Sequence, residues 1–438
     1  MPSINQIVDV QITRQTAAVA QAGFGVTLIV GHTATSVFDS GELVKEYTAV
    51  ADMLTDGFSS TSPEYLTAVR LMGQANKSQK FLVGVVTVGA TERVYDYVGT
   101  LTSGTVTFTV NGTPVSQVFV TDQESTMDAL AVALAANANI DSATWDDPEQ
   151  TLTITSNVGL QTLVSTALGD FTSVTQTTSA GTSTWAAELA AISEENDSWY
   201  VVIPARYSDS DAIAAADFAS SKNRILAITL YDADTLTTAT TGLAHTFSAA
   251  EYDRVATYWH QTFGEPLAAG SMGERLPTVP GSGTFKFKKV SGAVVSDLSS
   301  TQVTNAKAKN VNLLLSFGTN AVVTEGVVAS GEFIDTIIGT DWLTARISEN
   351  VFARLINLPK IPYSDVGFSI VESAIREVLA AGIRNGIILD DEGLTVNVLR
   401  RSEISSNDRA NRLLPDITFT ANLAGAVHFV QIRGTVSV

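Results

Sequence analysis

The two ends of the chain alternate apolar and polar side chains, and this pattern constrains the fold more than any other feature of the sequence. The alternation covers residues 7–13 (IVDVQIT) and 427–438 (VHFVQIRGTVSV). Its apolar positions are Val8, Val10 and Ile12 at the start and Val427, Phe429, Val430, Ile432 and Val436 at the end. A period of two is typical of a strand with one buried face. Such strands either close a sheet within the chain or add to a sheet in a neighbouring copy, and the pattern leaves both interpretations open.

Between these ends, apolar strand-like runs alternate with helical patterns. Buried strands are predicted at residues 26–30, 81–88, 199–203, 225–230 and 312–317. Ser62-Pro63-Glu64 supplies an N-cap, a first-turn proline and an acidic residue, and predicts a helix to about Gln74. Another helix is predicted at about 210–220. This order favours an α/β layered body with a largely parallel sheet.

Residues 94–184 interrupt the alternation and predict an inserted β-rich domain. The segment has nine acidic residues and no Lys or Arg, which is typical of a solvent-facing unit. Strands are predicted at residues 105–110, 115–120 and 151–155. Asn111-Gly112 is a strong signal for a tight turn between the first two. Ser125 and Asp128 resemble a capping box, which predicts a helix over 127–138.

A third region, residues 343–426, predicts a C-terminal α+β domain. Its helices are expected at 342–357 and 365–381, with Gly382 as the residue that ends the second. Two short alternating strands are expected at 395–399 and 417–423. The charge changes here as well, because residues 1–342 have a net charge of −19 whereas residues 343–438 contain ten basic and ten acidic side chains.

The sequence has no pattern of an enzyme or of a cofactor site. It lacks cysteine, and its four histidines lie in unrelated segments, so we expect no metal site. It has no nucleophile elbow and no phosphate-binding loop. The net charge of −19 argues against nucleic-acid binding. We find neither a leader nor an apolar run near the length of a membrane span, and expect no membrane binding by this chain.

One cluster of charge stands out in the C-terminal region. Six arginines fall within 37 residues: Arg376, Arg384, Arg400, Arg401, Arg409 and Arg412. They are either a solvated surface balanced by neighbouring carboxylates or a contact face for an oppositely charged partner, which the planar guanidinium group pairs with directionally.

Three segments resemble the tail sheath protein of contractile bacteriophages. They are residues 7–31 (IVDVQITRQTAAVAQAGFGVTLIVG), residues 326–343 (GVVASGEFIDTIIGTDWL) continuing through 360–367 (KIPYSDVG), and residues 412–438 (RLLPDITFTANLAGAVHFVQIRGTVSV). With the α/β body they cover most of the chain outside the insert. Because none of these segments is a catalytic motif, the specificity of the resemblance lies in their combination and order.

The resemblance implies a structural subunit of a virion tail that is made and assembled in the cytoplasm of the host bacterium. Sheath subunits form stacked hexameric rings around a tail tube, donate terminal strands to adjacent subunits, and contract to drive the tube through the host envelope. The implied partners are further copies of the chain, the tube protein, and the baseplate and tail terminator proteins. The resemblance implies that the sheath is assembled in an extended state of higher energy and that new contacts between subunits drive contraction, so no nucleotide is needed.

The implied division of the chain has six parts. They are the N-terminal arm 1–25, the body 26–93, the outer insert 94–184, the body 185–342, the tube-proximal domain 343–426 and the C-terminal arm 427–438. From their alternation we expect Val396 and Val398, with Ile417 and Phe419, to form the strands that receive a donated arm. The six arginines become candidate tube contacts. Rival interpretations are a subunit of another contractile injection machine, an adhesin-like surface protein, and an α/β enzyme without a recognised motif.

Overall fold

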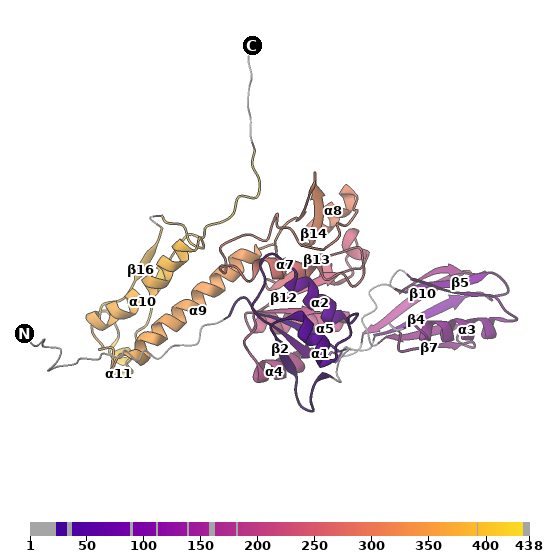
Figure 1. Cartoon of the computed structure of the whole chain (residues 1–438), viewed down its shortest axis with the longest axis horizontal. Coiled ribbons are helices and arrows are strands. Elements are labelled where there is room, and N and C mark those ends of the chain that lie inside the picture. The colour runs from indigo at the N-terminus through magenta and orange to yellow at the C-terminus, as the bar shows by residue number, and fades with distance from the viewer. Residues whose placement is uncertain are drawn as a thin grey trace, which may run out of the picture. The chain divides into compact units, whose positions relative to one another are not determined.

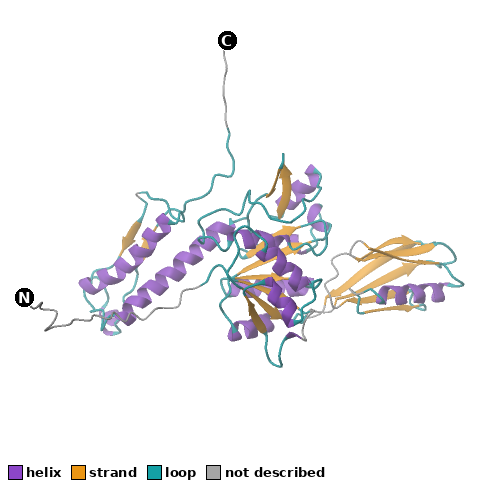
Figure 2. Ribbon diagram, viewed as in Figure 1, coloured by secondary structure: helices purple, strands orange, loops and turns teal. Residues whose placement is uncertain are grey.

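The computed structural model describes residues 23–32, 37–87, 91–110, 113–137, 140–156, 163–180, 183–391 and 393–431 (Figure 1). The described residues divide into two compact units. One contains residues 23–338 together with 426–431, and the other contains residues 339–425. Figure 2 shows that both units mix helices and strands. The predicted α/β class is therefore confirmed, whereas the six-part division of the chain remains a prediction.

The larger unit is built on an eight-stranded sheet in the order β15-β14-β13-β12-β11-β1-β3-β2. Its strands are β1 (Thr27–Gly31), β2 (Val44–Tyr47), β3 (Phe81–Val85), β11 (Val201–Pro204), β12 (Ile225–Leu230), β13 (Val255–Trp259), β14 (Asn312–Phe317) and β15 (Asn320–Val323). All neighbours pair in parallel except the two edge strands, β2 and β15, which are antiparallel. Strands β1, β12 and β13 are buried along their whole length, as expected for a parallel sheet covered on both faces.

The helices that connect these strands are α1 (Val50–Asp56), α2 (Pro63–Met72), α4 (Trp185–Glu195), α5 (Asp209–Ser221), the short η3 (Asp234–Leu236), α6 (Leu243–Ala249), α7 (Leu267–Arg275) and α8 (Ser300–Ala308). Three of them, α2, α5 and α8, begin at side-chain caps. The Ser62 hydroxyl accepts a hydrogen bond from the Tyr65 amide, so the predicted start of α2 is confirmed. Ser208 and Asp211 form a capping box that starts α5.

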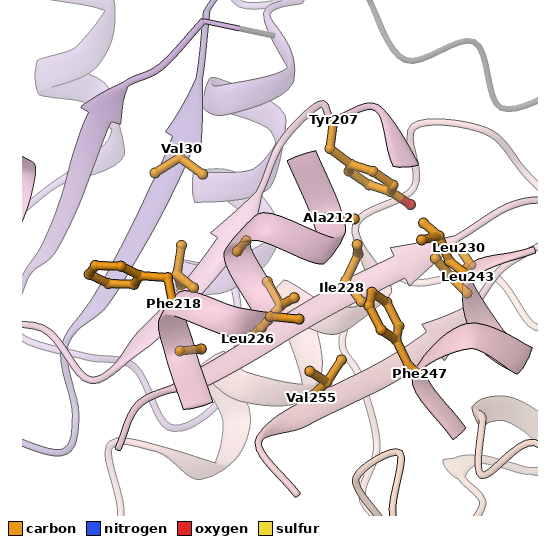
Figure 3. Packing of buried hydrophobic residues seen from close by; sticks show 14 of the residues in the cluster. Val30, Tyr207, Ala212, Phe218, Leu226, Ile228, Leu230, Leu243, Phe247 and Val255 are labelled. Atoms are coloured by element: carbon orange, nitrogen blue, oxygen red, sulfur yellow. The ribbon is translucent and has the colours of Figure 1, made fainter. Parts of the chain in front are cut away.

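The core of this unit lies between the sheet and its helices. Figure 3 shows the apolar side chains of β12, Leu226 and Ile228, among residues of the flanking helices such as Phe218 and Phe247. Both strand residues and Phe247 are completely buried. Trp185 is also completely buried, and its indole nitrogen donates a hydrogen bond to the carbonyl of Thr87 at 2.8 Å. Burial of a large apolar side chain contributes about 1.5–3 kcal/mol, so this cluster is the main stabilising element of the body.

Residues 91–180 form two further sheets and one helix. A four-stranded sheet has the order β10-β4-β8-β7 and a three-stranded sheet has the order β6-β5-β9. The elements are β4 (Thr91–Val98), β5 (Thr105–Val110), β6 (Thr113–Val118), α3 (Gln123–Ala135), β7 (Ser142–Asp146), β8 (Thr151–Ser156), β9 (Leu163–Leu168) and β10 (Ser173–Ala180). Their buried side chains make a separate core, in which the rings of Tyr95 and Phe108 meet edge to face at 4.8 Å.

Two details of this segment were not expected. The helix begins one turn earlier than predicted, because the carboxylate of Asp122 accepts a hydrogen bond from the Ser125 amide at 2.7 Å and caps α3. The predicted capping box at Ser125 is therefore wrong. A second carboxylate, Asp170, accepts hydrogen bonds from the side chain and amide of Thr102 and from the Ser103 amide, and these lower its pKa to about 2.

The smaller unit pairs two long helices with a short hairpin. Its elements are α9 (Ile334–Asn357, which begins in the larger unit), α10 (Asp365–Arg384), β16 (Thr395–Asn397), α11 (Ser406–Ala410) and β17 (Thr418–Thr420). The predicted end of α10 at Gly382 is wrong. The helix continues to Arg384 because Gly382 lies inside it at a close packing point, where an added Cβ would be 3.0 Å from Ile388 and 3.1 Å from Leu343.

Candidate assembly surfaces

The hairpin predicted to receive a donated strand is formed in the smaller unit. Strands β16 and β17 pair antiparallel, with Val396 opposite Phe419. The Val396 side chain is buried, whereas Phe419 is 43% exposed. The Arg376 guanidinium donates a hydrogen bond to the carbonyl of Val396 at 3.2 Å, which ties β16 to α10. The structure thus brings together two of the four residues predicted for the recipient strands.

Val398 and Ile417 lie outside the two strands, so their predicted strand conformation is wrong. The ladder stops before them for two reasons. After β16, the amide of Arg401 donates to the carboxylate of Asp365 at 2.7 Å, which holds this segment against the start of α10. Before β17, Asp416 has a φ of 53°, a left-handed conformation that an extended strand does not contain.

The hairpin leaves backbone edges open. Within the described residues its sheet contains only β16 and β17, so each strand is paired on one side. All three residues of β17 are exposed. Beside the end of β16 lies an open groove of about 270 Å³, lined by Asp365, Phe368, Ser369, Glu372, Val398, Leu399 and Arg400. An unpaired edge next to a groove is a surface on which an extended segment can add a strand.

The C-terminal arm is described as far as residue 431 and has no strand partner in the described structure. Its apolar side chains are turned to solvent: Val427 is 76%, Phe429 84% and Val430 67% exposed. Three neighbouring apolar side chains this exposed are unusual and mark an interaction surface. The other predicted arm residues lie outside the described residues; they are Ile432, Val436, Val8, Val10 and Ile12.

The six arginines have different environments. Arg376 forms an ion pair with Glu372 at 2.7 Å, and Arg409 donates to the carbonyl of Ile404 at 2.6 Å. These two side chains are engaged within the unit. The others are exposed, and in the described part of the chain their guanidinium groups form no hydrogen bond or ion pair; they are Arg384, Arg400, Arg401 and Arg412. Four positive side chains therefore remain available to an external partner.

Titratable groups gather at the carboxyl ends of β1, β11 and β12, where ligands bind in many parallel sheets. Burial lowers the pKa of His32 and of Arg206, whose guanidinium lies 4.7 Å from the centre of the Phe263 ring. Burial raises the pKa of Asp232, which accepts a hydrogen bond from the Thr235 amide at 2.8 Å. The cavity at this edge has a volume of about 40 Å³, enough for about three water molecules.

Sequence reasoning missed this edge because its members come from distant segments. No spacing in the sequence signals that His32 and Arg206 are neighbours. Among the described residues, no group of three or more His, Asp or Glu side chains is arranged to hold a metal ion. In the same part of the chain, no helix is both long and apolar enough to cross a membrane.

Comparisons with known proteins bear on the whole fold and on the C-terminal region. Residues 334–400 match the family model "E217 tail sheath protein gp31-like, C-terminal domain". The sequence matches no curated protein. Among solved structures, the chain is similar to the helical sheath of the anti-feeding prophage (AFP) in its contracted state, with a TM-score of 0.52 and 10% identity over 99% of each chain.

Two further structures show the same likeness. A chain of the AFP baseplate in the contracted state has a TM-score of 0.54 and 9% identity, over 99% of this chain and 100% of that chain. The contracted PVC sheath complex of an extracellular contractile injection system has a TM-score of 0.50 and 8% identity, over 98% of this chain and 97% of that chain. At such low identities the likeness establishes the fold. The chain therefore has the fold of contractile tail sheath proteins, and its residues 334–400 are similar to the E217 gp31-like tail sheath C-terminal domain.

Proposed function

We propose that this chain is the structural sheath subunit of a contractile bacteriophage tail. The subunit polymerises as stacked hexameric rings around the tail tube by exchange of terminal strands. On triggering, the sheath contracts and drives the tube through the host envelope. The observation that carries the proposal is that one chain has both an open two-stranded hairpin and an exposed apolar arm.

Strand exchange accounts for both features. Residues 427–438 donate a strand to the edge of the β16–β17 hairpin of a neighbouring subunit, and residues 7–13 donate a second one. The backbone hydrogen bonds of the added strands hold the subunits together irrespective of side chains, while Val427, Phe429 and Val430 lose the solvent exposure they have in the single chain. This pairing persists during contraction, so the subunits repack without coming apart.

The distribution of charge supports an orientation of the subunit. The domain at 343–426 lies nearest the tube, where Arg384, Arg400, Arg401 and Arg412 offer unengaged guanidinium groups to an acidic tube surface. The insert at 94–184, which has no basic side chain, faces outward. The remaining partners are the baseplate and the tail terminator. The protein has no enzymatic activity and resides in the virion tail after assembly in the host cytoplasm.

The test is a deletion of residues 427–438, compared with the full chain by electron microscopy at increasing concentration, with and without the cognate tube. The truncated chain is expected to stay folded and unassembled, whereas the full chain forms rings or striated tubes. A matched control replaces Val427, Phe429, Val430, Ile432 and Val436 with serine and keeps the length of the arm. Normal tubes from the truncated chain would contradict strand donation.

A second candidate is a sheath subunit of a different contractile injection machine. The likeness to the AFP and PVC structures favours it specifically, because both cover almost the entire chain. Purification of native particles that contain the chain separates the two candidates. Particles with a nucleic-acid-filled head support the phage tail, and headless particles support the alternative.

A further inference from the structure

One residue of the C-terminal arm contacts the body of its own chain. The Nε2 atom of His428 lies 3.0 Å from the hydroxyl of Thr284. Its ring also meets two aromatic rings edge to face, that of Phe333 at 4.6 Å and that of Phe287 at 6.4 Å between centroids. Val427 and Phe429 on either side are exposed. The arm therefore touches the body through a histidine while its apolar side chains point into solvent.

The surface under His428 is held in an unusual backbone conformation. Phe287 has a φ of 61°, which is rare for a bulky residue because its Cβ crowds the backbone. Two hydrogen bonds maintain it: the Phe287 amide donates to the Val323 carbonyl at 2.8 Å, and the Val323 amide donates to the Lys288 carbonyl at 2.9 Å. Gly326 approaches the residue before Phe287 closely, since an added Cβ would be 2.6 Å from the Lys286 backbone nitrogen.

Ion pairs restrain Lys286, the residue that precedes Phe287. Lys286 forms an ion pair with Glu325 at 2.9 Å, and Lys307 pairs with the same carboxylate at 2.6 Å. The Lys286 ammonium is also 5.3 Å from the centre of the Phe287 ring, within reach of a cation–π interaction. The exposed Phe287 ring is thus restrained on both its backbone and its side chain, so that it presents a preformed contact to the arm.

A buried carboxylate lies close to this surface. One oxygen of Asp335 is buried and has no hydrogen-bond partner within the described residues. Burial raises the pKa of Asp335, an effect that is opposed by the nearby His428 and Arg275. An unsatisfied buried oxygen is unfavourable. The electrostatic environment of this carboxylate therefore includes one side chain of the arm, His428, together with Arg275 of the body.

We propose that Thr284, Phe287 and Phe333 form a latch that fixes His428, and with it the start of the C-terminal arm, to the body of the same subunit. The arm then leaves the body at a defined point. Ten residues, 429–438, follow the latch in the sequence, and they would span about 33 Å if fully extended, which bounds how far the proposed donated segment 427–438 could reach beyond His428. The destination of these residues rests on the strand exchange proposed above, whereas the latch itself is a property of the single chain.

The latch limits the distance between the body of a subunit and the hairpin that receives its donated strand. An arm that could detach from the body would reach hairpins at variable distances, and the donated strand could then pair in several registers. A fixed departure point restricts the neighbouring hairpin to positions within the reach of the ten residues that follow the latch. We therefore infer that the latch sets the spacing between linked subunits.

Spin labelling of the full chain tests this inference. Because the sequence contains no cysteine, a nitroxide can be attached at Val430→Cys alone. Electron paramagnetic resonance is recorded on unassembled chain, at concentrations below polymerisation. The latch predicts a restricted nitroxide whose rotational correlation time is about threefold longer than after His428→Ala, which releases the arm without altering the body.

A matched pair of variants tests whether the restricted motion of the nitroxide depends on the latch surface. Phe287→Ala should mobilise the nitroxide as His428→Ala does, whereas Phe317→Ala should not; the two phenylalanines are 47% and 53% exposed. Thr284→Val provides a second variant of the latch if Phe287→Ala fails to fold. A nitroxide that is already mobile in the otherwise unaltered chain, or unaffected by His428→Ala, would overturn the proposal. If the nitroxide shows an intact latch but the chain does not polymerise, the result would contradict the proposed strand exchange and leave the latch supported.

Discussion

Replacing Val427 and Val430 together with alanine should raise the concentration at which the chain polymerises. The two side chains are 76% and 67% exposed in the single chain, so assembly can remove most of their surface from water. Each substitution deletes two carbon atoms, and burial of one methylene contributes about 0.8 kcal/mol. Scaled by these exposed fractions, the double substitution costs about 2 kcal/mol for each donated arm.

A loss of this size corresponds to an increase of about 30-fold in critical concentration. The assay is sedimentation of polymer from a concentration series, with the tube supplied if the chain needs it as a template. The matched control is Val118→Ala with Val132→Ala in the insert, where the side chains are 62% and 71% exposed. The control should polymerise as the unaltered chain does. An equal effect of both pairs, or no effect of the arm pair, would refute the reasoning.

Three further predictions concern the two units and the arginines. Gly382→Val should lower the melting temperature of the chain, at an overpacking cost of about 1–3 kcal/mol, whereas Ser373→Val on the exposed face of α10 should not. Asp170→Asn should lower the melting temperature at neutral pH; because the folded-state pKa is about 2, below the ordinary value of 3.8, the difference from the unaltered chain should shrink as the pH falls from 3.8 towards 2. Arg400→Glu with Arg401→Glu should weaken pelleting with the tube more than self-assembly, and equal loss of both would contradict a tube-facing role.

Much of the body could be predicted because its signals are local. The apolar run at 225–230 is buried on both faces, and such runs require a covered parallel strand. Ser62 caps α2 through an amide three residues away, which a sequence pattern can indicate directly. The errors came from competition between local signals and packing. The N-cap of α3 is Asp122, three residues before the predicted Ser125. Gly382 lies inside α10, where it allows close packing against Leu343 of α9, and it does not end the helix.

The assembly surfaces were only partly predictable, since their contacts join distant segments. The pairing of Val396 with Phe419 follows from alternation, but the left-handed Asp416 that shortens β17 carries no comparable signal. Six clustered arginines look equivalent in the sequence, yet Arg376 and Arg409 are engaged within the unit. His428 and Thr284 are 144 residues apart, so nothing in the sequence indicates their contact.

The path of α9 has a mechanical consequence. This helix runs without interruption from Ile334 to Asn357 and crosses from the larger unit into the unit that begins at Gly339. A change in the orientation of residues 339–425 would therefore have to bend or unwind α9, because the helix is continuous across this boundary. Gly339 is the single glycine of α9, and glycine weakens a helix interior by about 1 kcal/mol relative to alanine. The helix is thus weakest at the boundary itself, and about five turns of it continue beyond Gly339 into the smaller unit.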